Sequence, residues 1–227
     1  MKHLAKKKSK KQARKEARKK ELRAEKKKDL FFKLGIFLVV IIIVAVWIYF
    51  ASRPAYIPQP AGPSSGPDDA QVVFLQFGCF TCPLTQQFNL NVLPTLMEEY
   101  GDEVKFVFRS VPIYSNQGAG EAHVASKCAD DQGFFWEYSQ SLFRGGPYTQ
   151  QSLITRAVDM GMDEDEFAAC LNSGIYEEVV REDYLAAQRA RITLTPTVFI
   201  NDVRLNGAFE IGLYRRVLDD VIADAAS

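Results

Sequence analysis

Hydrophobic and polar positions follow two different periods along residues 71–226. Short apolar runs rich in Val and Phe, typical of strands, occur near both ends of this stretch, and segments with a 3.6-residue period lie between them. The order strand, helix, strand, helical block, hairpin, helix indicates a small mixed sheet flanked by helices, in the α/β or α+β class. The expected strands are QVVFLQF (71–77), VKFVFRS (104–110), PTVFI (196–200) and VRLNGA (203–208), and the expected helical regions are about 80–100, 119–190 and 211–226.

The connections between these elements predict how the strands pair. A helix joins the first two strands, and a connection of this length implies parallel pairing. Pro94 should kink or break that helix, and Gly101 should end it. Asn201 and Asp202 are turn residues between the last two strands, which predicts an antiparallel hairpin.

A longer apolar run, LGIFLVVIIIVAVWIYF, occupies residues 34–50 without a charge. As a helix it would be about 25 Å long, and residues 30–33 extend it toward the roughly 30 Å of a bilayer core. We predict an uncleaved transmembrane helix over 30–50. A cleaved signal peptide is the alternative, but the charged region before the run is long and no small-residue cleavage site follows it. A buried soluble helix is a third interpretation, which the flanking lysines disfavour.

Charge is segregated along the chain, although the net charge is zero. Residues 1–33 hold 16 of the 28 Lys and Arg but only four acids, so the other 194 residues have a net charge of −12. So acidic a domain is a poor candidate for binding nucleic acid. The positive-inside rule predicts that the basic arm at 1–29 stays in the cytoplasm and contacts anionic headgroups. Residues 51–227 would then lie outside a cell membrane that the chain crosses once.

Residues 51–69, ASRPAYIPQPAGPSSGPDD, contain five of the ten prolines, interspersed with Gly and Ser. This composition predicts a solvated, semi-extended tether without a core of its own. The folded domain is therefore expected over 70–227.

Cys79 and Cys82 lie three positions apart where the first strand ends and a helix begins. Unpaired N–H groups and the dipole at a helix N-terminus favour a thiolate, which is the attacking species in disulfide exchange. We predict that Cys79 is the exposed nucleophile and Cys82 the more shielded partner that resolves a mixed disulfide. Pro83 supports this placement because proline is tolerated in the first turn of a helix.

Two other interpretations of this pair are weaker. An inert disulfide across so small a loop gains little entropically. A zinc site built from all the cysteines would need Cys128 and Cys170, and neither lies in a second CxxC motif. No Rossmann glycine pattern or P-loop is present, so we expect no organic cofactor and no metal.

The segment FLQFGCFTC (74–82), the TPTVFI run (195–200) and the following NGAF (206–209) resemble the thioredoxin superfamily. The stretch CADDQGFFWEYSQSLF (128–143) resembles its DsbA-like branch of thiol–disulfide oxidoreductases. The resemblance spans roughly 71–225.

This resemblance implies a thioredoxin-like α/β fold with a helical insertion at about 115–190. It also implies a cis peptide between Thr195 and Pro196, packed beside the CxxC motif. These two residues would bind substrate, with the backbone of Thr195 offered to an incoming strand.

The chain departs from the DsbA-like pattern at two places. Phe80 and Thr81 stand between the cysteines, so the motif lacks an imidazole that could stabilise the thiolate. Gln76 replaces an acid, and a neutral amide cannot accept a proton from the buried thiol. The direction of electron flow is therefore left open.

Cys128 and Cys170 both fall in the helical block. We favour a structural disulfide, which the chain-entropy model values at about 4 kcal/mol for a loop of roughly 40 residues. A second redox pair and two free thiols are the alternatives. His123 is interpreted as a surface or satisfied residue without a role.

The leading hypothesis is a membrane-tethered thiol–disulfide oxidoreductase that acts outside the cytoplasm through Cys79 and Cys82. Its partners would be protein thiols and disulfides, and a redox partner in the membrane. A thioredoxin-like binding or chaperone module is one alternative. Delivery of copper or zinc by the same soft thiol ligands is another.

Overall fold

The computed structural model describes residues 35–48 and 56–226, which belong to two units divided after Ala55. In the first unit, residues 35–48 are helical. Across the two described ranges, no helix is both long and apolar enough to cross a membrane. The span expected over 30–50 extends past the described residues at both ends, and the basic arm at 1–29 lies outside them.

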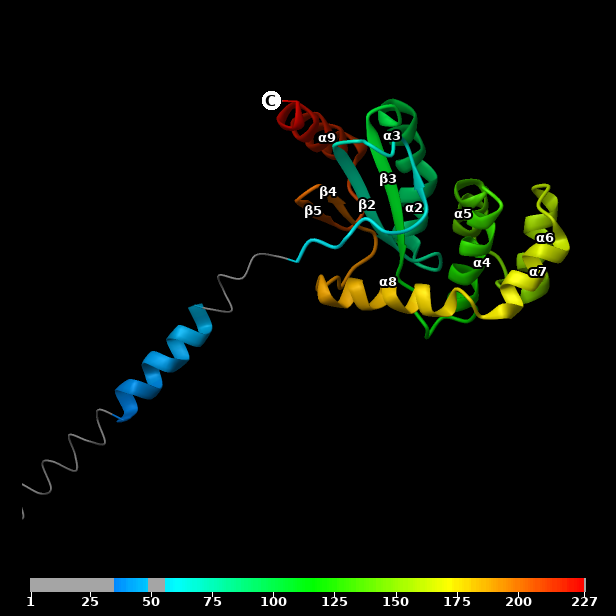
Figure 1. Ribbon diagram of the computed structural model, residues 1–227. Coiled ribbons are helices and arrows are strands. Elements are labelled where there is room, and N and C mark those ends of the chain that lie inside the picture. Colours follow the sequence, from blue (N-terminus) through cyan, green and yellow to red (C-terminus); the bar gives the residue numbers. More distant parts are fainter. Residues whose placement is uncertain (1–34, 49–55, 227) are drawn as a thin grey trace, which may run out of the picture. The chain divides into compact units, whose positions relative to one another are not determined.

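The second unit is built on a mixed sheet with the strand order β1-β3-β2-β4-β5 (Figure 1). The central strands β2 (Val72–Gly78) and β3 (Val104–Ser110) pair in parallel, as their helical connection predicts. β4 (Thr197–Ile200) runs antiparallel to β2, and β5 (Val203–Asn206) completes the expected hairpin.

The proline-rich segment supplies an edge strand, β1 (Ser64–Ser65), which pairs antiparallel with β3. Phe108 N–H donates to the Pro63 carbonyl at 3.0 Å, and Arg109 Nη1 donates to the Gln59 carbonyl at 3.1 Å. The expected tether over 51–69 and the domain boundary at residue 70 are therefore wrong for residues 56–69. Proline lacks an N–H but keeps its carbonyl, so such a segment can still bond to an open strand edge.

Two helices replace the single one expected between β2 and β3. α2 (Pro83–Asn91) and α3 (Leu93–Tyr100) meet at Val92, so the break lies two residues before Pro94. Pro94 itself falls in the first turn of α3, where the backbone N–H would have no helical partner.

The helical insertion follows β3. Most of it lies to one side of the sheet, and its last helix runs back beneath the strands (Figure 1). Its extent agrees with the expected 115–190, and α9 (Ile211–Ala225) ends the domain. The helices of the insertion are α4 (Ala119–Asp131), α5 (Phe135–Phe143), α6 (Gln150–Asp159), α7 (Glu164–Ser173) and α8 (Glu177–Arg189).

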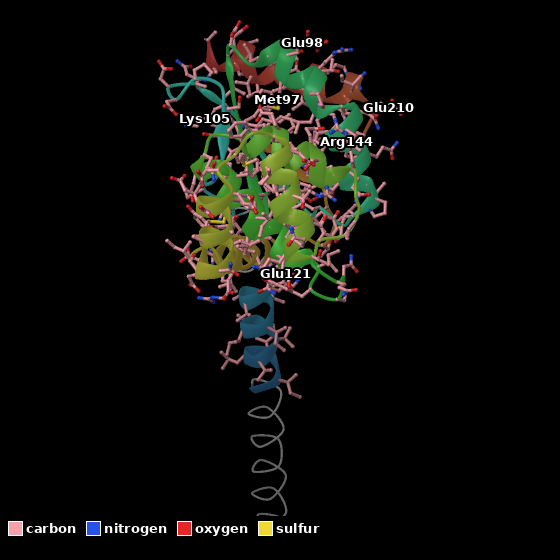
Figure 2. The ribbon with its side chains drawn as sticks, turned by 90° about the vertical axis from the view of Figure 1, so that its right-hand side faces the viewer. Met97, Glu98, Lys105, Glu121, Arg144 and Glu210 are labelled. Atoms are coloured by element: carbon pink, nitrogen blue, oxygen red, sulfur yellow. A yellow bond between two sulfur atoms is a disulfide. The ribbon has the colours of Figure 1, made fainter. Side chains whose placement is uncertain are left out.

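Side-chain alternation along β2 gives the sheet two apolar faces. Phe74 and its same-face neighbours pack against α2, α3 and α9. Leu75 and Phe77 pack against the small residues Ala186 and Ala187, which let α8 approach closely. Charged side chains such as Glu98 and Glu210 point outward (Figure 2).

A buried ionic cluster joins the sheet to the insertion. Asp183 on α8 accepts from Arg109 Nε at 2.6 Å and from the Ser110 N–H at 3.0 Å. Lys127 Nζ on α4 lies 3.3 Å from the same carboxylate. Such a cluster fixes how β3, α4 and α8 meet, because removing one partner would leave a buried charge uncompensated.

Candidate active site

The CxxC motif forms a turn between β2 and α2. Cys82 N–H donates to the Cys79 carbonyl at 3.3 Å, and Cys82 is the N-cap of α2, which begins at Pro83. Gly78 is required before the turn, since a Cβ there would lie 2.5 Å from Cε2 of the buried Phe108. Both cysteines are free thiols.

Both cysteines are buried, which corrects the prediction of an exposed Cys79. The exposed fraction is 0% for Cys79 and 8% for Cys82. Phe80, the residue after Cys79, is also fully buried, with its ring centroid 5.4 Å from that of Phe108 and 4.7 Å from that of Phe143. Insertion of this large apolar ring between the sheet and the helical block draws the turn inward.

Thr81 makes a side-chain hydrogen bond to the sulfur of Cys79, with Oγ1 and Sγ 3.2 Å apart. Asn116 Nδ2 donates to the same Thr81 oxygen at 2.9 Å. Because Thr81 Oγ1 accepts from Asn116, its own proton is available for Cys79 Sγ. The motif's second intervening residue thus supports a thiolate without being an imidazole.

The two thiols have opposite pKa shifts. A hydrogen bond from Cys82 lowers the pKa of the Cys79 thiol most, and His123 and Thr81 lower it further against the opposing effect of burial. The same hydrogen bond and burial raise the pKa of Cys82, while Thr195 lowers it. The pair therefore carries a thiolate at Cys79 and a proton at Cys82.

His123 is a site residue that the sequence interpretation missed. It is fully buried on α4, with its ring centroid 4.6 Å from that of Phe80. The expectation of a surface or satisfied residue is wrong, because the ring is fully buried and neither of its nitrogens has a hydrogen-bond partner among the described residues. The local signal was faint: His123 lies among the small, core-facing alanines of α4, where a polar ring is unusual.

The peptide between Thr195 and Pro196 is cis and lies beside the motif, as the resemblance implies. A groove of about 310 Å³ runs from Cys82 to Thr195. Its walls are apolar except for threonines, and side chains such as Leu84 and Leu194 remain exposed. The lining residues are Cys82, Pro83, Leu84, Val111, Ile113, Ile192, Thr193, Leu194 and Thr195.

Gln76 lies on β2, opposite Phe108 and Val198, and only 1% of it is exposed. Neither polar atom of its side chain has a hydrogen-bond partner among the described residues. The buried side chain at this position of β2 is a neutral amide and supplies no carboxylate.

The family model described as Thioredoxin matches residues 59–220. The chain belongs to this thioredoxin family. The match includes the CxxC turn, the cis-proline loop and the whole helical insertion. It also includes most of the edge segment around β1, which the sequence interpretation had assigned to a tether.

Several relatives are named as disulfide-forming proteins. Disulfide bond formation protein D of Bacillus subtilis is 28% identical over 151 residues, which cover 62% of this chain and 68% of that protein. The Na⁺/H⁺ antiporter NhaA of Herminiimonas arsenicoxydans is 28% identical over 174 residues, or 74% of this chain. The aligned part is only 28% of the antiporter's own length.

Solved structures share the fold. Oxidised BdbD from Bacillus subtilis superposes with a TM-score of 0.66 at 24% identity, covering 75% of this chain and 100% of that one. The α-DsbA1 protein of Wolbachia pipientis gives 0.66 at 22% identity, covering 75% and 95%. The relatives named disulfide bond formation protein D and the structural neighbours are thus DsbA-type protein disulfide oxidoreductases.

The second cysteine pair lies within the helical insertion of the thioredoxin fold. Cys128 on α4 and Cys170 on α7 are joined by a disulfide, with Cα atoms 5.9 Å apart and a sequence separation of 42. Cys128 is 1% exposed. The pairing follows the expectation, and its assignment as structural rather than redox-active stays a prediction.

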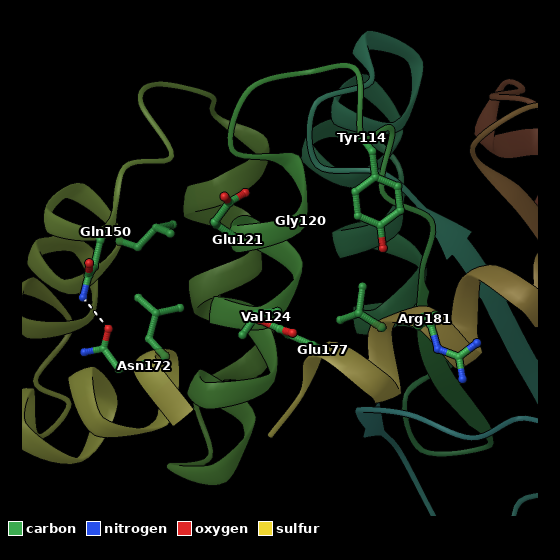
Figure 3. Close-up of a pocket in the computed structure, with 11 residues that line it drawn as sticks. Tyr114, Gly120, Glu121, Val124, Gln150, Asn172, Glu177 and Arg181 are labelled. Atoms are coloured by element: carbon green, nitrogen blue, oxygen red, sulfur yellow. Dashed lines mark hydrogen bonds between the residues drawn. The ribbon is translucent and has the colours of Figure 1, made fainter. Parts of the chain in front are cut away.

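A separate pocket of about 490 Å³ lies between the insertion helices (Figure 3). Val124 and Leu153 give it an apolar wall, and Gln150 Nε2 donates to Asn172 Oδ1 at 2.7 Å on its rim. Within residues 35–48 and 56–226, no group of three or more His, Cys, Asp or Glu side chains could hold a metal ion.

Proposed function

We propose that this chain is a thiol–disulfide oxidoreductase that donates a disulfide to protein substrates through Cys79 and Cys82. The observation that carries the proposal is the asymmetry of the pair. Hydrogen bonds lower the pKa of Cys79, while the pKa of Cys82 is raised. Stabilising the Cys79 thiolate favours the reduced pair, so its disulfide is a stronger oxidant.

The exchange begins when a substrate thiolate attacks Cys79 of the Cys79–Cys82 disulfide. The enzyme's S–S bond breaks, a mixed disulfide forms with Cys79, and Cys82 leaves and takes up a proton. A second substrate thiolate then attacks the substrate sulfur of the mixed disulfide, and Cys79 leaves as a stabilised thiolate. The substrate gains a disulfide and the enzyme pair holds the two electrons, which the proposed membrane partner must accept.

The apolar groove beside Cys82 is the proposed substrate-binding surface. Exposed Leu84, Ile113 and Leu194 offer contacts for apolar side chains of an unfolded chain. The backbone of Thr195 is in position to pair with an extended substrate segment. Proteins that have yet to form their disulfides expose both features.

We propose that this chemistry takes place outside the cytoplasm, on a domain tethered by residues 30–50. The uncharged run at 34–50 and the basic residues of 1–29 support a single span with a cytoplasmic amino terminus. The disulfide between Cys128 and Cys170 supports an oxidising compartment, since such bonds are rare in the cytosol.

Activity is tested with the full-length oxidised protein and a reduced, unfolded model substrate that regains activity when its disulfides form. We expect the wild type to oxidise the substrate stoichiometrically and Cys79→Ser to have no effect above background. Thr149→Ser, at the exposed N-cap of α6, is the matched control and should behave as wild type. If the wild type and Cys79→Ser protect the substrate from aggregation equally, with no thiol transfer, the binding-module alternative is favoured instead.

Topology is tested with full-length chains that carry a carboxy-terminal reporter active only outside the cytoplasm. We expect reporter activity in the membrane fraction. Replacing the arm's Lys and Arg residues with neutral ones should lower the active fraction, because the charge bias sets orientation. An inactive reporter on chains that are present in the membrane fraction would contradict the proposed localisation.

A further inference from the structure

His123 is the most unusual buried polar side chain near the motif. None of it is exposed, and its ring contacts those of Phe80 and Phe108, with centroids 4.6 Å and 6.4 Å away. Neither ring nitrogen has a hydrogen-bond partner among the described residues, where Cys79 and Cys82 are free thiols. An unsatisfied imidazole in an apolar core costs free energy, so its presence calls for a function.

Three groups act on this ring from the elements around it. Cys79 interacts with it from the CxxC turn, Lys127 from one turn further along α4, and Asp183 from α8. Burial lowers the pKa of His123 most, Lys127 lowers it further, and Cys79 and Asp183 raise it. An imidazole with a lowered pKa is neutral at pH 7 and keeps one N–H to donate.

We propose that His123 stabilises the Cys79 thiolate of the reduced enzyme by donating its ring N–H, and that it thereby makes the Cys79–Cys82 disulfide more oxidising. This inference rests on the proposed function and deepens it. The helical insertion supplies the imidazole that the Phe80–Thr81 dipeptide lacks, and Phe80 packs against that ring, with the two centroids 4.6 Å apart.

The effect depends on the redox state. On reduction, two electrons from the substrate dithiol and one proton enter the pair, the proton on Cys82 and the charge on Cys79. A donor beside Cys79 then gains a charge-assisted hydrogen bond. In the oxidised state the sulfur is neutral and a much weaker acceptor, so this stabilisation is gained only when the thiolate forms. Stabilising only the reduced state shifts the equilibrium toward it.

The test compares full-length wild type with His123→Phe, which keeps an aromatic ring beside Phe80 and removes both nitrogens. Thiolate absorbance near 240 nm is followed against pH, and the redox equilibrium is measured in glutathione buffers. We expect the pKa of Cys79 to rise by about one unit. The equilibrium should move about tenfold toward the oxidised pair, which equals a potential lower by about 30 mV.

Phe143→Leu is the matched control, because Phe143 packs on Phe80 at 4.7 Å but carries no hydrogen-bonding group. Should the larger Phe prevent folding at position 123, His123→Leu makes the same test with a side chain closer in volume. The inference is overturned if the His123 variant shifts the pKa and the equilibrium no further than Phe143→Leu. Failure of the proposed function is a different result, namely a wild type without exchange activity dependent on Cys79.

Discussion

Cys79 and Cys82 lie in a turn between β2 and α2 as separate thiols, whereas Cys128 and Cys170 join α4 to α7 covalently. The first pair is only three positions apart in the sequence, and its disulfide would close a loop too small to stabilise the chain much. The second pair is 42 positions apart and constrains a long loop of the unfolded chain. The sequence separation of each pair therefore favours a different role: disulfide exchange for the first pair and stabilisation of the fold for the second.

The two cysteine pairs also differ in the residues that surround them. Cys82, His123 and Thr81 lower the pKa of Cys79 and so favour its reduced state. Cys128 lies in the apolar core of the helical insertion. Cysteine thus has two different environments in this chain. In the hydrogen-bonded turn it is a thiol suited to disulfide exchange, and in the helical insertion it forms a cross-link between two packed helices.

Removing the second pair should separate stability from activity. Cys128→Ala together with Cys170→Ala should lower the free energy of unfolding by up to about 4 kcal/mol, because the loop constraint is lost. Urea denaturation measures the loss. Disulfide transfer should persist under conditions where the variant is folded. An activity loss as deep as that of Cys79→Ser would make the second pair a redox relay.

Disturbing the CxxC turn should lower activity as well as stability. Gly78→Ala places a Cβ 2.5 Å from Cε2 of the buried Phe108, which should cost about 1–3 kcal/mol of stability and displace Cys79. We expect slower disulfide transfer in the folded variant, measured by single-turnover kinetics. Gly212→Ala on α9 is the control, since its added Cβ meets nothing within 4 Å. Equal transfer rates in both variants would show that the turn tolerates the shift.

The free energy of unfolding of the reduced protein should depend on pH through the ionisation of Cys79. Its folded-state pKa is lowered, so its contribution is fully present above the unfolded-state pKa of about 8.5 and is lost as pH falls through the folded-state pKa. Between pH 6 and 7, the free energy of unfolding of reduced wild type should rise by up to about 1.4 kcal/mol more than that of reduced Cys79→Ser. The raised pKa of Cys82 adds no slope there, because that thiol is protonated in both states. A flat difference between the two proteins would contradict the thiolate assignment.

Local patterns predicted most of the domain. The apolar runs placed β2, β3 and the final hairpin, and helical periodicity located the insertion. Pro83 correctly indicated where α2 begins, because proline is restricted to the first turn of a helix. The edge strand at Ser64–Ser65 was missed, since its pairing depends on an open edge of β3 and on no period of its own.

By itself, the sequence determined where the CxxC turn lies, because the two cysteines, the preceding Gly78 and the following Pro83 are neighbours along the chain. Only the tertiary structure decided what environment they meet. Asn116 donates to Thr81 across 35 positions, and His123 on α4 lowers the pKa of Cys79. Contacts of this kind arise from how β2, β3 and α4 pack around Phe80. They cannot be predicted from the side-chain periodicity of a single element, because that periodicity does not specify which other element it meets.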